Sequence, residues 1–384
     1  MHVVVVGGGF GGVKTALELS KKQIGRITLI SDESYFLHHA TLYATATGKN
    51  IAESIIPLTT IFANHPNVEL VQDKVVSFDP KRHLISGKKD YHYDKLVLSL
   101  GSVTTYFNIK GIKQHAYGIK NIGQIKDFHE HIHDELVHQK LDKEYFVIGA
   151  GSTGVEMAAA LNDYLKQLIT TYRLKQTASK VTLVEAAARI VPHVSKTASS
   201  KITQQLKKQG INVRTNHQVS ALEDDKIIIN GKSYPTTTAI WTSGVANNPF
   251  YQHNAANFQL ANDGRVNVNP YLEALNDVYV IGDGSTVKFS GTAWPTLKQA
   301  KHVASNITRL ATKRPQERFR PTSSPWGIPL GPKWGYAEWH GIYVAGRSGA
   351  LTRRLMELYG YCQLLPIKQA IPVWRAHELP AVEN

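Results

Sequence analysis

The sequence predicts an α/β fold with two Rossmann-type dinucleotide-binding domains, a β-meander and a C-terminal amphipathic region. Three features predict it: a glycine fingerprint near the start of the chain, a second fingerprint near residue 150, and short alternating strands between them. At 384 residues the chain exceeds one ordinary domain, because about 150 residues per domain is typical. A composition of 42% hydrophobic and 19% charged residues favours a globular α/β protein over a fibrous or disordered one.

The first fingerprint follows a β-branched strand at residues 2–6. Gly7, Gly9 and Gly12 stand in the order G-x-G-x-x-G, with Phe10 after the second glycine and helix-forming residues behind. The first glycine permits a tight turn, the second lets the backbone approach a pyrophosphate, and the third lets the helix pack closely on the strand. Such a motif is weak evidence alone, but the flanking strand and helix favour a nucleotide site.

The same arrangement recurs in the middle of the chain, which strengthens the prediction. A strand at residues 145–148 leads into Gly149, Gly151 and Gly154, followed by Glu156 and a helical stretch. Two fingerprints in this context predict two separate dinucleotide sites.

The strand after each fingerprint ends near a candidate ribose ligand. The strand at 181–184 ends on Glu185, where a carboxylate can accept from a ribose 2′-hydroxyl and would repel a 2′-phosphate. This favours NADH over NADPH, with an ordinary solvated carboxylate as the alternative. After the first fingerprint the equivalent position is Ser31, with Asp32 next along, so the first ribose ligand stays open between them.

Four alternating segments between the fingerprints predict a β-meander over the first site, at residues 68–71, 74–78, 83–86 and 91–93. Val75 in this region is a candidate cofactor contact. A strand ending before Gly101 is expected to return to the first domain, and a later strand ends on Gly282 and Asp283. An acid between glycines at a strand end can lie against a bound polyol, although Gly-Asp-Gly is also a common turn.

Charge and cysteine content narrow the function. The formal charge of +14 favours an anionic partner, but no nucleic-acid-binding motif is present, so nucleic acid is not expected. Cys362 is the only cysteine, which excludes an intrachain disulfide, a CxxC redox pair and a cysteine-rich metal site; no metal site is expected. The sequence starts directly in a strand, without a secretory signal, and no uncharged run approaches the ~20 residues that span a bilayer. We therefore expect a cytoplasmic protein with at most peripheral membrane contact.

Together these motifs resemble the two-dinucleotide-binding-domain flavoproteins, from Met1 to about Leu310. Within that group the chain looks most like the type II, non-proton-pumping NADH:quinone oxidoreductases. The closer resemblance rests on residues 7–12, Leu42 and Tyr43 with Ala46, Thr47 and Gly48, residues 100–102, residues 149–156, and residues 241–245, which include Gly244. It implies FAD at the first fingerprint, NADH at the second, quinone as the acceptor, Asp283 near the FAD ribitol and Glu156 beside the flavin.

The resemblance also implies how the domains divide the chain. Residues 1–112 and 245–312 would form the FAD-binding domain, residues 113–244 the NADH-binding domain, and residues 313–384 a region for membrane association or dimerisation. In the resembling enzymes a helix beside the flavin carries two glutamines facing the quinone; the matching positions here are Lys298 and His302. They lie four apart and so share a helix face. There they would stabilise charge on the quinone or donate a proton, with solvated helix residues as the alternative.

A C-terminal helix at 351–365 carries leucines on one side and Arg353, Arg354 and Glu357 on the other. A basic amphipathic helix favours an interfacial anchor on the inner face of the cell membrane, with docking to the protein's own core or to a second copy in a homodimer as the alternative. Two other functions stay open: a soluble NADH-dependent reductase of a ferredoxin-like protein or small acceptor, and an NADH-sensing flavoprotein with little turnover.

Overall fold

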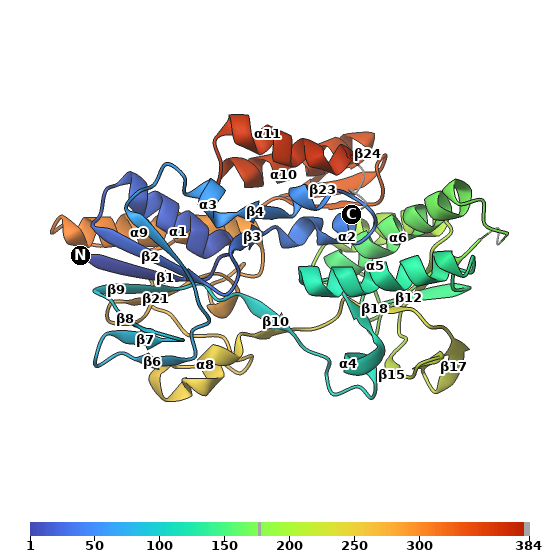
Figure 1. Ribbon diagram of the computed structural model, residues 1–384, viewed down its shortest axis with the longest axis horizontal. Coiled ribbons are helices and arrows are strands. Elements are labelled where there is room, and N and C mark those ends of the chain that lie inside the picture. Colours follow the sequence, from blue (N-terminus) through green and yellow to red (C-terminus); the bar gives the residue numbers. More distant parts are fainter. Residues whose placement is uncertain (176–177, 380–384) are drawn as a thin grey trace.

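In the computed structural model, which describes residues 1–175 and 178–379, each fingerprint follows a central strand of its own parallel sheet (Figure 1). The first sheet has six strands in the order β20-β21-β9-β1-β2-β5. Its strands are β1 (His2–Val6), β2 (Arg26–Ser31), β5 (Val68–Gln72), β9 (Lys95–Leu98), β20 (Glu273–Leu275) and β21 (Val278–Val280). All neighbours pair in parallel except the β20–β21 edge. Strands from both ends of the chain therefore build one sheet.

Two helices pack together beside this sheet. Helices α1 (Phe10–Lys21) and α9 (Ala293–Ala311) contact each other along their lengths. Their buried apolar residues join those of β1 and β2 in one hydrophobic core. This core fixes the first fingerprint, at the start of α1, against the start of α9.

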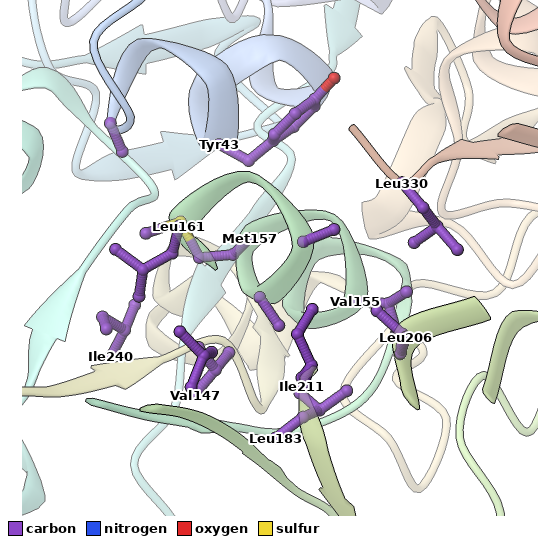
Figure 2. Close-up of a cluster of buried hydrophobic side chains, with 14 of the residues drawn as sticks. Tyr43, Val147, Val155, Met157, Leu161, Leu183, Leu206, Ile211, Ile240 and Leu330 are labelled. Atoms are coloured by element: carbon purple, nitrogen blue, oxygen red, sulfur yellow. The ribbon is translucent and has the colours of Figure 1, made fainter. Parts of the chain in front are cut away.

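The second sheet has five parallel strands in the order β11-β18-β12-β13-β14. Its elements are β11 (Tyr117–Gly118), β12 (Glu144–Ile148), β13 (Lys180–Val184), β14 (Asn212–Arg214) and β18 (Ala239–Trp241), with helices α5 (Ile122–Val137), α6 (Ser152–Thr171) and α7 (Lys196–Lys208). Figure 2 shows α6 lying between Val147 and Leu183 of this sheet and Tyr43 of α2 (Leu42–Thr45). The second fingerprint is therefore anchored by a core that also includes a segment of the first part of the chain.

The β-meander is shorter than predicted. It contains β6 (Ser77–Asp79), β7 (Leu84–Ser86) and β8 (Asp90–His92), paired antiparallel. Residues 68–71, predicted as its first strand, instead form β5, which pairs in parallel with β2 at the edge of the first sheet. An edge strand of a parallel sheet is only half buried, so its pattern resembles that of an antiparallel strand.

The remaining short elements include three small antiparallel sheets: β10-β19, β3-β4 and β15-β16-β17. One antiparallel pair, β10 (Ser102–Thr104) with β19 (Val245–Asn247), carries the two crossings between the sheets. The others are β3 (Tyr35–Leu37), β4 (Ile55–Pro57), α3 (Leu58–Ile61), α4 (Ile112–His115), β15 (Val219–Leu222), β16 (Lys226–Ile229), β17 (Lys232–Pro235) and α8 (Pro249–His253). The residue boundaries predicted for the domains stay a prediction.

The C-terminal region forms a three-stranded sheet followed by two helices, drawn in orange to red in Figure 1. Glycine allows close packing here: a Cβ at Gly349 would lie 2.1 Å from the carbonyl oxygen of Gly335. The region contacts the cores of both large sheets. Leu330 packs in the core of the second sheet, and Tyr361 packs in the core of the first sheet. Its elements are β22 (Trp326–Pro329), β23 (Gly335–Trp339), β24 (Ile342–Gly346), α10 (Arg347–Cys362) and α11 (Ile367–Arg375).

The predicted C-terminal helix forms as α10, and its charged side is the one that faces the protein. Arg353 and Glu357 are 7% and 2% exposed, whereas Leu351 and Leu355 are 59% and 50% exposed. Around these four residues the polarity is the reverse of an ordinary surface helix, whereas Leu358 and Cys362, further along the predicted apolar side, pack against the core of the first sheet. Across residues 1–175 and 178–379, no helix is both long and apolar enough to cross a membrane.

Candidate functional site

A large cavity of about 1120 Å³ opens at the carboxyl ends of the first sheet's strands, where open α/β sheets bind their ligands. It runs from the first fingerprint, past the start of α6, to the inner side of α10. Ten of the predicted site residues line it: Gly7, Gly9, Phe10, Ser31, Asp32, Val75, Gly101, Glu156, Gly282 and Asp283.

The two fingerprints have the same backbone geometry. A Cβ at Gly12 would lie 1.9 Å from the carbonyl oxygen of Gly7, and a Cβ at Gly154 would lie 1.8 Å from that of Gly149. Gly12 and Gly154 therefore close the helix against the strand and do not line either cavity.

The middle glycine of each fingerprint is different. A Cβ built on Gly9 or Gly151 meets no atom within 4 Å. Each of these glycines thus faces open space at a helix N-terminus, which suits a pyrophosphate. This fits FAD at the first loop and NADH at the second.

At the end of β2 the cavity wall is polar. Ser31 is buried, and its hydroxyl accepts a hydrogen bond from the amide of Glu33 at 3.2 Å. Asp32 and Glu33 are exposed and line the cavity. Ser31 therefore shapes the turn, and the two acids beside it are the carboxylates available to a ribose.

At the opposite wall, Asp283 belongs to a hydrogen-bonded group. The Ser102 hydroxyl donates to the Asp283 carboxylate at 2.9 Å, and the Lys120 ammonium donates to the Ser102 oxygen at 3.3 Å. Burial lowers the pKa of Lys120, partly offset by the charge of Asp283. The amide of Gly282 donates to the Gln299 side chain at 2.8 Å, which ties this turn to α9.

A second, smaller cavity of about 200 Å³ lies at the second fingerprint. It is lined by Gly149, Glu185 and Trp241 among others. The Glu185 carboxylate accepts from the amides of Ala150 and Ala187 at 2.7 and 2.8 Å. An acid held at this place suits recognition of an unphosphorylated ribose.

Glu156 lies near the start of α6, just after its first turn, at the wall of the large cavity. It is 6% exposed, and burial raises the pKa of its carboxyl to about 8. Its charged neighbour is Arg353 of α10, with 3.8 Å between guanidinium nitrogen and carboxylate oxygen. A carboxyl with such a pKa carries a proton at neutral pH and can donate it.

Lys298 and His302 lie outside both cavities. The Lys298 ammonium donates to the Thr322 hydroxyl at 2.6 Å, and His302 is paired with Asn306 at 3.1 Å and packs edge-on against Phe319. The Lys298 ammonium also lies over the ring of Trp294, 5.9 Å from its centroid, and Trp294 lines the large cavity. Gly244, Gly151 and the packing glycines Gly12 and Gly154 also lie outside both cavity walls.

Other cavity residues come from segments that the sequence did not single out as site residues. His38 is buried among aromatic rings, and burial lowers its pKa to about 3. Arg353 and Glu357 of α10 line the cavity, as do Trp294 and Tyr359, whose rings stack 4.4 Å apart. One sequence signal was available: Arg353 and Glu357 stand four residues apart on the charged side of the predicted helix, a spacing that allows an ion pair.

The family comparison agrees with this geometry. The pyridine nucleotide-disulphide oxidoreductase family model matches residues 1–305. The chain belongs to this family. Unlike a member that uses a redox disulphide, it contains a single cysteine, Cys362, so no cysteine pair takes part in its chemistry.

Among curated members of the family, the chain is 28% identical over 380 residues to the type II NADH:quinone oxidoreductase of Staphylococcus epidermidis, covering 92% of this chain and 94% of that protein. It is 26% identical to the Staphylococcus aureus enzyme of the same name, with the same coverage. Among solved structures it is similar to NDH2 from Plasmodium falciparum in complex with NADH, with a TM-score of 0.85, 18% identity, and coverage of 98% and 97% of the two chains.

Proposed function

We propose that this protein is an FAD-dependent oxidoreductase that transfers electrons from NADH to a quinone, as a type II NADH:quinone oxidoreductase. The observation that carries the proposal is the continuity of the large cavity. One space extends from the first fingerprint to the Glu156 wall and the inner side of α10. A flavin held there can therefore meet a second ligand at the α10 end, and the full-length similarity to enzymes of this activity supports the assignment.

The positions of these residues suggest separate roles in binding FAD and NADH. Gly7, Gly9 and Asp283 would hold the pyrophosphate and ribitol of FAD, and Glu185 would select NADH. When bound, FAD supplies two-electron chemistry, accepting electrons from NADH and releasing them to the acceptor. No cysteine relay is available, so the acceptor must reach the cavity itself.

The overall reaction, NADH + H⁺ + quinone giving NAD⁺ + quinol, consumes one proton. Glu156 is a candidate to hold this proton, because its buried carboxyl has a pKa of about 8 and lines the cavity. Proton donation by one positioned group contributes about 10²- to 10⁴-fold to a rate. We place the acceptor at the end formed by Trp294 and Tyr359, whose stacked rings line the cavity; the Lys298 ammonium lies 5.9 Å from the Trp294 ring centroid, but neither Lys298 nor His302 lines the cavity wall.

The exposed side of the C-terminal region suits a membrane surface. Large apolar side chains are exposed along β24, α10 and α11, namely Ile342, Tyr343, Val344, Leu351, Leu355, Tyr359 and Ile367. Tyr359 belongs both to this surface and to the cavity wall, so a lipid-soluble acceptor would enter directly from the bilayer. We propose peripheral attachment to the inner face of the cell membrane by this apolar surface, with a homodimer interface as the competing use.

Steady-state anaerobic assays test the function. We expect sustained NADH oxidation with a soluble quinone and negligible rates with a ferredoxin. Fast ferredoxin reduction would instead identify a soluble reductase, and a single turnover with either acceptor would identify an NADH sensor. In either of these cases the quinone proposal fails.

A further inference from the structure

Arg353 and Glu357, on the charged side of α10, form a buried group of ion pairs with Glu156 of α6. Arg353 lies between Glu156 and Glu357: its two terminal nitrogens are 3.8 Å from a Glu156 oxygen and 2.9 Å from a Glu357 oxygen. The other Glu357 oxygen contacts Arg354. Glu156, Arg353 and Glu357 are all less than 10% exposed, so these charges interact with little solvent screening.

The carboxyl groups of Glu156 and Glu357 both lie beside the Arg353 guanidinium, and Glu357 is the closer of the two. Arg353 makes a hydrogen-bond-length contact with Glu357 but only a longer one with Glu156. The longer distance exceeds that of a charge-assisted hydrogen bond. The guanidinium thus attracts the Glu156 carboxyl at 3.8 Å without a direct hydrogen bond.

We propose that Glu357 is a positioning residue for the reaction: it holds Arg353 away from Glu156, so that Glu156 keeps a proton at the cavity wall. This inference rests on the proposed function for its role in turnover. Without Glu357, the Arg353 side chain would be free to pair with Glu156 directly. Glu156 would then be an ionised carboxylate and could not donate.

The position of Glu357 is itself fixed from two sides. Arg354 donates to the Trp374 carbonyl at 2.6 Å and lies over the Trp374 ring, which anchors it to α11. Beyond Arg354, Glu53 lies 4.0 Å away, fully buried, and pairs with His377 at 2.8 Å. These contacts hold Glu357 at its place on α10.

Among the described residues, the charged groups near the two carboxyls are Arg353, Arg354, Glu53 and His377. Burial and the charge of Glu357 raise the pKa of the nearby Tyr361 phenol, which stays neutral. Glu156 is influenced by Arg353, which lowers its pKa, and by Glu357, which raises it. On the other side of the cluster, burial and both acids raise the pKa of the Tyr43 phenol, which therefore stays neutral. Burial and the Arg353 charge keep His38 neutral. None of these neutral neighbours supplies a competing charge.

Infrared spectroscopy of the purified holoprotein, without NADH or quinone, tests the inference. A protonated carboxyl gives a C=O band, and we expect a band at neutral pH that Glu156→Gln removes. In Glu357→Gln its titration midpoint should fall by about one to three pH units, the effect of a cation coming into contact with a carboxylate. Glu357→Asp should restore most of the wild-type midpoint. Glu130→Gln, which removes a matched i,i+4 partner of Lys126 on α5, should leave it unchanged.

Arg353→Met provides the opposite test and serves if Glu357→Gln does not fold. Without the guanidinium, the midpoint should rise above the wild-type value. An unchanged midpoint in the variant that folds, or no Glu156 band at neutral pH, overturns the inference. Because this readout needs no acceptor, it is separate from the proposed function: quinone turnover with an unshifted midpoint rejects only the role of Glu357, and a shifted midpoint without quinone turnover rejects only the quinone.

Discussion

The Glu185 carboxylate accepts a hydrogen bond from the backbone amide of Ala150, inside the second fingerprint. The acid that is proposed to select the ribose therefore also holds the glycine loop in shape. A 2′-phosphate would bring a second negative charge to a place where one is already fixed.

We predict a preference for NADH over NADPH that Glu185→Gln reduces by about tenfold, or ~1.4 kcal/mol. The amide oxygen still accepts one of the loop's hydrogen bonds, so the main change is the loss of charge. The measurement is kcat/KM with each cofactor. The control is Asp224→Asn, which removes an exposed acid between β15 and β16. Equal efficiency of the wild-type protein with both cofactors would show that Glu185 does not face the ribose.

The two middle glycines give a paired prediction. Gly9→Val should yield colourless protein, because the valine would fill the space proposed for the FAD pyrophosphate while meeting no protein atom near its Cβ. Gly151→Val should purify with full flavin content but lose NADH binding, since only the second loop is filled. Flavin absorbance and NADH titration measure both effects. A fully flavinylated Gly9→Val protein contradicts the assignment of the first loop.

These loops were predictable because the fingerprint, its strand and its helix are contiguous in the sequence. Contacts between distant segments were not. The strand at 68–71 was wrongly placed in the meander, because its half-buried pattern does not reveal its parallel neighbour β2. The Glu156–Arg353 contact joins residues in α6 and α10. Because these helices are far apart in the sequence, no local sequence pattern predicts the contact.

The positions of Lys298 and His302 show a second limit. Both lie in α9, four residues apart as the sequence shows, but which residues of α9 meet the cavity depends on its packing against α1. Leu297 lines the cavity, whereas the Lys298 ammonium donates to Thr322 and lies over the ring of cavity-lining Trp294.

From this placement we predict that Lys298→Met and His302→Gln leave flavin reoxidation by a soluble quinone near the wild-type rate. Glu156→Gln, in contrast, should slow reoxidation by about 10²-fold, because it removes the proposed proton donor. Stopped-flow absorbance measures each rate. Slow reoxidation in the Lys298 or His302 variant, with a normal rate in Glu156→Gln, would return the acceptor to that face of α9.

Membrane attachment by α10 predicts a separable phenotype. Leu351→Glu combined with Leu355→Glu should abolish binding to vesicles of mixed zwitterionic and anionic lipids, since both side chains are exposed and apolar. Activity with a water-soluble quinone should be retained. Val137→Glu, at an equally exposed apolar position on α5, is the control in vesicle flotation. Unchanged flotation, with loss of a dimer instead, would assign the surface to self-association.

The most direct test of the central claim is an anaerobic double-mixing experiment on the wild-type protein. NADH is added first, in an amount equal to the flavin, and a soluble quinone second, while flavin absorbance is followed. The account predicts rapid bleaching by NADH, rapid recovery on adding quinone, and one quinol formed for each NADH consumed. Flavin that bleaches with NADH but stays reduced in excess quinone would contradict it.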